Sequence, residues 1–331
     1  MTDTGMRTTR AGRRGHKVLQ KAAKGKRVSA ALTLMTAIAE ATSAEAAFGL
    51  AIARFSHFGF PRANYGFTRF RSDRSMGDPD DALFLTTENE AFIQHYFRNN
   101  FYARTPVFRW AARNSGARTW AWVKEAYDEG RLTADEAATV RENVAVGVVA
   151  GLSVSFPETS ARSKGALGLI AAKGLDHGRV DAIFAEHGQE IIALAHVMHL
   201  KLITFPFPTR KRAMTTRQRE ALEWVADGKG TQDVAMLMGV SAAMVDKHLR
   251  LAREGLGVDT TAQAVAKATL LNLIFQRQPE PASGSVALGK ESPTFRSVTS
   301  SAFSALFREW GFGLGTADGR GTYFRFRPSA P

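Results

Sequence analysis

The sequence predicts an α+β protein: an amino-terminal α/β/α sandwich followed by an all-α domain of four helices. At 331 residues the chain is longer than one small core needs and suits two modest domains with tails. Residues 30–204 mix strand-like and helix-like hydrophobic periods, whereas residues 215–276 show helical periods alone. Residues 205–214 begin with Phe205-Pro206-Phe207-Pro208, which cannot continue a helix, and are therefore the predicted linker.

The composition places positive charge outside the larger predicted domain. Residues 1–30 carry nine Lys and Arg against one Asp, whereas residues 31–205 carry 18 basic and 19 acidic residues. Residues 1–29 have few large apolar side chains, so we expect a disordered basic arm. Two interpretations of this arm stay open, contact with a polyanion and a merely solvated tail.

Cysteine is absent, which excludes disulfides, thiol catalysis and cysteine-ligated zinc and fits a reducing cytoplasm. The amino terminus lacks the apolar core of a signal peptide, and no run of about 18 apolar residues could span a bilayer. We therefore expect a cytoplasmic protein that has no membrane partner.

The first half of the larger domain begins with two helices, because apolar residues recur at helical spacing on both sides of Thr42 and Ser43. Ser43 is the expected cap of the second helix. Alternation then predicts strands over residues 64–71 and 82–85, and a helical period returns over residues 88–98.

The second half of this domain contains a predicted helix over residues 133–146, with Thr133 as N-cap and Glu136 at the capping-box position. Residues 152–156 and 166–171 are predicted to form a hairpin, and residues 176–203 a long amphipathic helix. Helices that flank a mostly antiparallel sheet make the expected sandwich.

Residues 215–276 follow the pattern of a helix-turn-helix domain. Thr215 is expected to cap a first helix, which ends at Gly228. Thr231 is expected to cap a second, short helix, which a tight turn follows. Four apolar residues of the short helix are expected to face inward: Val234, Ala235, Leu237 and Met238.

The next predicted helix, residues 242–255, has one apolar face and one polar face. The polar face would read DNA through Ala243, Asp246, Lys247, Arg250 and Arg253. Lys and Arg side chains one turn apart can reach a guanine edge or a phosphate, and an Asp can accept from cytosine. A solvated helix face is the alternative interpretation.

Residues 216–274 closely resemble the carboxy-terminal domain of LuxR-type regulators. The resemblance is carried by Arg219-Glu220, Leu222, Trp224, Gly228, Val234-Ala235, Gly239-Val240-Ser241, Val245, His248-Leu249, Leu256-Gly257-Val258 and Ala262-Gln263-Ala264-Val265. It implies that Asp246, Lys247 and Arg250 contact double-stranded DNA and that a helix over residues 261–275 forms a homodimer. A twofold dimer would bind an inverted repeat, and RNA polymerase is a candidate further partner.

A second resemblance lies in the larger domain. Phe92-Ile93-Gln94-His95-Tyr96, Thr105-Pro106-Val107, Trp120, Gly147 and Gly151 resemble the autoinducer-binding domain of quorum-sensing LuxR proteins. The resemblance implies an N-acyl-homoserine lactone site that contains Phe92, Tyr96, Thr105, Pro106, Trp120 and Gly151. It also implies that the Tyr and the Trp donate hydrogen bonds to the ligand's carbonyl oxygens.

This sequence departs from that family at two of those positions. Phe92 stands where the family usually has Trp, and Thr105 where it has the Asp that accepts the ligand's amide N–H. A neutral acceptor makes a hydrogen bond about half as strong as a charged one. Two hypotheses follow, a ligand-responsive homodimer and a solo regulator that is ligand-independent or binds a different small molecule. Core packing of the aromatic residues stays open as a third interpretation.

No pattern in the sequence supports an enzyme. Gly228-Lys229-Gly230-Thr231 is a helix junction and not a phosphate-binding loop. His196 and His199 lie without a carboxylate pattern, so we expect packed or solvated side chains, no metal and no catalytic residue or cofactor. A phospho-receiver domain is disfavoured, because no acidic cluster follows the predicted strands. Residues 277–331 form a tail whose structure the composition does not decide.

Overall fold

The computed structural model describes residues 30–72, 76–78, 81–97, 101–207, 214–275 and 296–297. The predicted basic arm, most of the predicted linker and nearly all of the predicted tail lie outside these residues. The fold below concerns the described residues only.

An antiparallel sheet of six strands forms the centre of the larger domain, in the order β3-β4-β5-β1-β2-β6. The strands are β1 Arg62–Thr68, β2 Leu83–Thr86, β3 Gly116–Thr119, β4 Gly151–Ser155, β5 Lys164–Ile170 and β6 Arg296–Ser297. The predicted strands and the predicted hairpin are confirmed. Strand β3 was not predicted, since Gly-Ala-Arg-Thr offers almost no apolar alternation.

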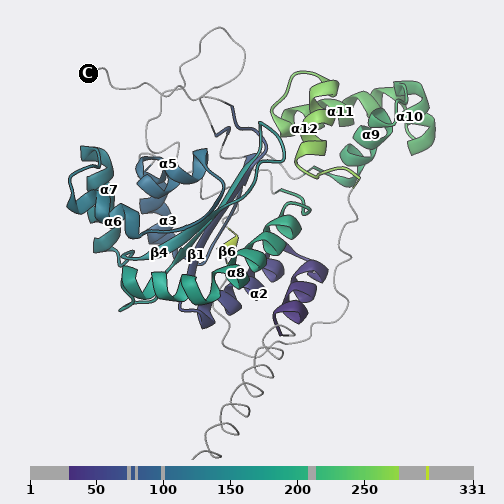
Figure 1. The fold of residues 1–331 in the computed structure, drawn as a ribbon. Coiled ribbons are helices and arrows are strands. Elements are labelled where there is room, and N and C mark those ends of the chain that lie inside the picture. The colour runs from purple at the N-terminus through teal and green to yellow at the C-terminus, as the bar shows by residue number, and fades with distance from the viewer. Residues whose placement is uncertain are drawn as a thin grey trace, which may run out of the picture.

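Helices cover both faces of this sheet, which confirms the α/β/α sandwich (Figure 1). Residues 30–40 are helical, and the later helices are α2 Ala44–His57, α3 Glu90–Phe97, α4 Phe101–Arg104, α5 Pro106–Arg113, α6 Ala121–Asp128, α7 Ala134–Ala145 and α8 His177–Leu202. Helices α2 and α8 lie along one face, and α3, α5, α6 and α7 lie beyond the other. The caps expected at Ser43 and Thr133 are present, the latter as a full capping box.

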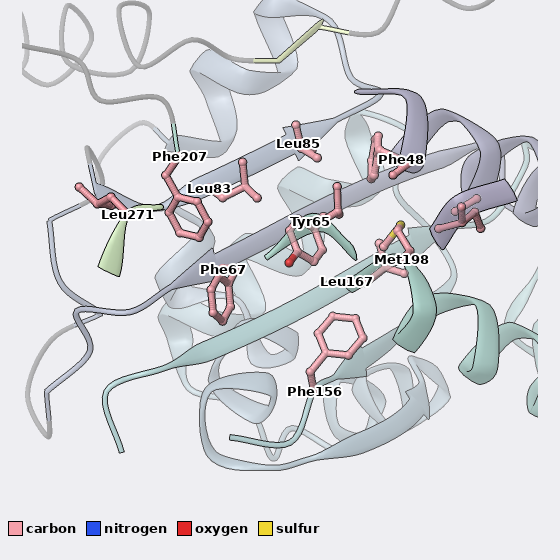
Figure 2. Packing of buried hydrophobic residues seen from close by; sticks show 14 of the residues in the cluster. Phe48, Tyr65, Phe67, Leu83, Leu85, Phe156, Leu167, Met198, Phe207 and Leu271 are labelled. Atoms are coloured by element: carbon pink, nitrogen blue, oxygen red, sulfur yellow. The ribbon is translucent and has the colours of Figure 1, made fainter. Parts of the chain in front are cut away.

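The two faces of the sheet carry side chains of different size. Large residues of β1 and β5, among them Tyr65, Phe67 and Leu167, are buried toward α2 and α8 (Figure 2). Because successive strand residues point to opposite faces, the other face receives the residues between them. In the middle of β1 and β5 these are Asn64, Gly66, Ala166 and Gly168, with Thr68 at the end of β1 and the larger Arg62, Lys164 and Ile170 at strand ends. The second face is therefore lined mainly by small side chains.

His199 of α8 is packed in this core, which is one of the two roles expected for it. Its ring stacks on Phe156 at 4.0 Å between centroids, and its Nδ1 lies 2.9 Å from the Tyr65 hydroxyl. Burial, with a smaller contribution from His196, lowers the pKa of His199 to about 4. The residue is a neutral hydrogen-bonding partner inside the domain.

Acid is therefore expected to destabilise the protein through this histidine. The unfolded chain takes up a proton near pH 6.5, whereas folded His199 resists it down to about pH 4, so stability is lost as pH falls between these values. The loss is at most about 3 kcal/mol, at about 1.4 kcal/mol per pKa unit. His199→Gln keeps a polar group toward Tyr65 but does not titrate. Urea unfolding at pH 7 and pH 4.5 should show a smaller acid effect in the variant, and an equal effect would contradict this assignment.

The smaller domain consists of α9 Thr216–Ala226, α10 Thr231–Met238, α11 Ala242–Leu256 and α12 Thr261–Leu270 (Figure 1). These four helices confirm the predicted helix-turn-helix fold. Three details of the prediction were wrong. Gly230, and not Thr231, is the N-cap of α10; Leu237 is 51% exposed; and α12 ends at Leu270, because Asn272 adopts a left-handed φ of 54°.

The two domains contact one another through the end of β1 and the end of α12. The Arg69 guanidinium donates to Leu270 O, to Asn272 Oδ1 and to Ile203 O. Phe207, in the predicted linker, is buried against Phe67 and donates its backbone N–H to Leu271 O (Figure 2). Part of the predicted linker is thus packed into the protein.

Candidate ligand cavity and DNA-binding surface

A cavity of about 670 Å³ lies against the small-residue face of the sheet. This size is typical of sites for drug-sized molecules. Five of the six predicted ligand-site residues line it: Phe92, Tyr96, Thr105, Pro106 and Trp120. Its lining also contains polar residues that no motif in the sequence indicated, among them Asn64, Tyr102, Tyr127, Ser153 and Lys164.

The cavity is open because its floor has little side-chain volume. A Cβ added to Gly168 would meet its nearest atoms, Asn64 O and Trp120 Cζ2, only at 3.9 Å. Across the sheet, Ser153 of β4 and Asn64 of β1 flank Gly168. Larger residues at these register positions would fill the space that the helices enclose.

An aromatic wall forms one side of the cavity. Phe92 and Tyr96 lie one turn apart on α3, and their rings stack at 5.6 Å between centroids. The Tyr102 ring lies 5.9 Å from that of Tyr96. Burial, with a smaller contribution from Tyr102, raises the pKa of Tyr96, so its hydroxyl stays protonated at neutral pH.

Thr105 lines the cavity and also begins helix α5. Its hydroxyl accepts a hydrogen bond from the Phe108 N–H at 3.3 Å and donates one to Tyr102 O at 2.8 Å. Pro106 follows at the first helical position, where its missing N–H costs nothing. The Thr105 proton is therefore committed to the backbone, and at most a lone pair faces a ligand.

Trp120 is held by the edge of the sheet at the start of α6. Its backbone N–H donates to Gly151 O at 2.8 Å, and its indole N–H donates to Ser153 Oγ at 3.0 Å. A Cβ on Gly151 would lie 2.7 Å from the indole and 2.2 Å from Leu169 O. Gly151 is not among the lining residues. Its observed role is to leave room for the Trp120 ring.

The helix α11 presents one exposed polar face. Ala243, Asp246, Lys247 and Arg250 are exposed, and Ser241 caps the helix. Arg250 forms an ion pair with Glu254 on the same helix. Arg253 is different: it is half-buried and donates to Thr261 Oγ1 at 3.0 Å. Four of the five predicted DNA-contacting residues thus lie together on the open face.

Among the described residues, no group of three or more His, Asp or Glu side chains is placed to hold a metal ion. Within the same residues, no helix combines the length and the apolar character needed to cross a bilayer.

Comparison with known proteins identifies both halves of the chain. Residues 43–202 match the autoinducer binding domain, and residues 212–268 match the bacterial regulatory proteins of the luxR family. The transcriptional activator SolR of Ralstonia solanacearum is 30% identical over 232 residues, which cover 68% of this chain and 89% of SolR. The quorum sensing-dependent regulator RpaR of Rhodopseudomonas palustris is 27% identical, over 64% of this chain and 84% of RpaR.

The crystal structure of Escherichia coli SdiA aligns with 75% of this chain and 99% of its own, at 17% identity and a TM-score of 0.44. The two domain matches and the SolR similarity together decide the assignment. This chain belongs to the LuxR family of transcription regulators and carries an autoinducer-binding domain ahead of its LuxR-type helix-turn-helix.

Proposed function

We propose that residues 30–204 bind an N-acyl-homoserine lactone and that residues 215–276 bind an inverted-repeat DNA site as part of a homodimer. The observation that supports the ligand most directly is the cavity, where apolar walls surround two hydroxyl donors, those of the protonated Tyr96 and of Ser153, whose oxygen accepts from the Trp120 indole N–H. Lactone and amide carbonyl oxygens are acceptors that fit such donors. The relative RpaR is described as quorum sensing-dependent, which also supports a lactone ligand for this chain.

The proposed ligand residues are Phe92, Tyr96, Thr105, Pro106 and Trp120, with Gly151 as the support of Trp120. In the proposed DNA contact, Ala243, Asp246, Lys247 and Arg250 of α11 enter the major groove, and Arg253 braces the helix against Thr261. We also propose that the protein is located in the cytoplasm and that it contacts RNA polymerase.

The second candidate function is a solo regulator that binds a different small molecule or none. Thr105 favours it, because a hydroxyl that caps α5 replaces the charged acceptor of the family. A thermal-shift and DNA-retardation pair with a panel of micromolar lactones separates the candidates. A lactone that stabilises the protein by mass action and changes DNA affinity supports the first, and retained DNA binding without any lactone effect supports the second.

The β1–β2 loop offers a physical route from the cavity to the DNA-binding domain. Met76 and Gly77 of this loop line the cavity, and a Cβ on Gly77 would lie 2.7 Å from Phe70 O. The Phe70 ring in turn lies 5.7 Å from Lys267 Nζ of α12, and Lys267 pairs with Asp81 at 2.8 Å. A ligand that moves this loop would therefore act on the end of α12.

Arg69→Met is expected to weaken that coupling. The variant removes the donor to Leu270 O, Asn272 Oδ1 and Ile203 O but keeps the unbranched apolar part of the side chain. Hydrogen exchange should rise at residues 203–207 and 270–273. The effect of ligand on DNA affinity should fall by about fivefold or more, the lower end of typical allosteric coupling. Arg179→Met, on the exposed side of α8, is the matched control. Unchanged exchange and unchanged coupling in Arg69→Met would refute this route.

A further inference from the structure

The cavity has a second polar end, formed by Lys164. Lys164 opens β5 on the same face as Gly168, which lies beneath the Trp120 ring. The two positions are four residue steps apart along the strand, roughly 13 Å at about 3.3 Å per step. A ligand whose head lies at Trp120 and whose chain is extended along β5 would bring its far end to Lys164.

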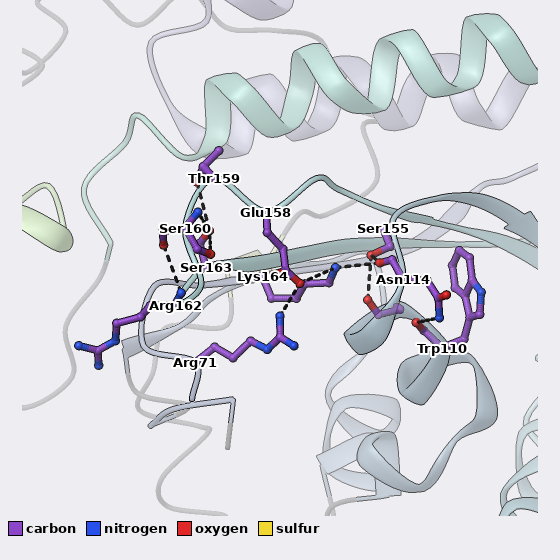
Figure 3. Close-up of polar contacts among 11 residues, drawn as sticks. Arg71, Trp110, Asn114, Ser155, Glu158, Thr159, Ser160, Arg162, Ser163 and Lys164 are labelled. Atoms are coloured by element: carbon purple, nitrogen blue, oxygen red, sulfur yellow. Dashed lines mark hydrogen bonds and ion pairs between the residues drawn. The ribbon is translucent and has the colours of Figure 1, made fainter. Parts of the chain in front are cut away.

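The Lys164 ammonium is buried but only partly satisfied. Its side chain is 3% exposed, Nζ donates to Asn114 O at 2.8 Å, and Glu158 Oε1 lies 3.2 Å away (Figure 3). These contacts use two of its three N–H donors. Burying an ammonium group costs free energy, whereas burying an apolar side chain at the same position would not. A structural role at the start of β5 therefore does not by itself require a lysine.

The charges around Lys164 leave an excess of cations. Glu158 accepts from Arg71 as well as from Lys164, so one carboxylate is shared by two positive side chains (Figure 3). Glu158 is itself 36% exposed, whereas Lys164 belongs to the cavity lining. An oxygen acceptor that entered from the cavity would therefore come within reach of Lys164 before it reached Glu158.

We propose that Lys164 determines ligand specificity by binding an oxygen acceptor at the far end of the acyl chain. This inference rests on the proposed function, since it requires a ligand whose head occupies the Trp120 end. A terminal carboxylate would balance the second cation, and a terminal ketone would occupy the remaining N–H donor. A methyl end would leave that donor facing apolar carbon.

Binding to the full-length protein by titration calorimetry tests the inference with three matched probes. These are N-octanoyl-homoserine lactone, its 7-oxo form and its 7-carboxyheptanoyl counterpart. The wild type is expected to bind at least one oxygen-ended probe about tenfold tighter than the methyl-ended probe, since a hydrogen bond to a charged group contributes about one decade in affinity. Lys164→Met should remove this preference, whereas Lys173→Met, at an exposed lysine outside the cavity lining, should keep it.

Each outcome decides a different point. The inference is overturned if all three probes bind the wild type equally, or if Lys164→Met keeps the preference. Lys164 would then have only a structural role at the start of β5, and the proposed function would still stand. If none of the probes binds and no lactone of the panel shifts the unfolding temperature, the proposed function fails and this inference fails with it; if a lactone of the panel binds but none of the probes does, only the inference is overturned. Should Lys164→Met not fold, Glu158→Gln provides the test: it removes the competing carboxylate and should increase the preference for the carboxylate-ended probe.

Discussion

Gly168→Met is expected to weaken ligand binding strongly while the protein stays folded. The methionine would extend from the sheet into the space beneath Trp120, where the nearest atoms lie 3.9 Å from the Cβ position. Overpacking costs about 1–3 kcal/mol, so a ligand that must share this space should lose affinity by on the order of 100-fold. Calorimetry with the best-bound lactone measures the loss.

Gly168→Ala is the matched control for this variant. Its methyl group would make ordinary van der Waals contacts, so most of the affinity should remain. Both variants should unfold at or above the wild-type temperature, because glycine weakens a strand interior. Full affinity in Gly168→Met would mean that the ligand does not occupy this cavity.

The double variant Lys247→Ala, Arg250→Ala is expected to lose specific DNA binding by on the order of 1,000-fold. Both side chains are exposed on α11, and each base or phosphate contact contributes about 1–3 kcal/mol, doubled when two copies of the helix bind two half-sites. The loss is measured by retardation of a duplex that the wild type selects from a random library. The salt dependence of binding should also become shallower, because fewer counterions are released.

The control for charge alone is Arg179→Ala together with Lys173→Ala. These residues are exposed in the autoinducer-binding domain, away from α11, so DNA affinity should change little. If the control and the α11 variant lost affinity equally, the effect would be one of net charge and α11 would not be the recognition helix.

The elements that local chemistry specifies were predictable from the sequence. Ser43, Thr133 and Thr215 cap their helices because their side chains accept a hydrogen bond from a first-turn N–H, whatever the surrounding fold. By contrast, α4, α5 and α6 span four to eight residues each, too few for a clear hydrophobic period. Leu237 was misplaced since a short helix has too few turns to separate its buried face from its exposed one.

The candidate site was predictable only in part. Motif resemblance selected Phe92, Tyr96 and Trp120, which line the cavity. It did not select Lys164, whose position depends on strand register. One signal was available: in β1 and β5 large residues alternate with small or polar ones, and a face of small residues between helices indicates a cavity. The contact of Arg69 with Asn272 joins residues distant in sequence, and no local pattern could indicate it.

The central claim is that ligand in the cavity and DNA on α11 are coupled. The most direct test is to measure the Kd of the best-bound lactone for the full-length protein with and without its selected DNA duplex. Because coupling is reciprocal, the account predicts that DNA changes lactone affinity by the same factor by which lactone changes DNA affinity, about 5-fold to 150-fold. The same lactone Kd in both conditions would contradict the account, even if each partner bound tightly on its own.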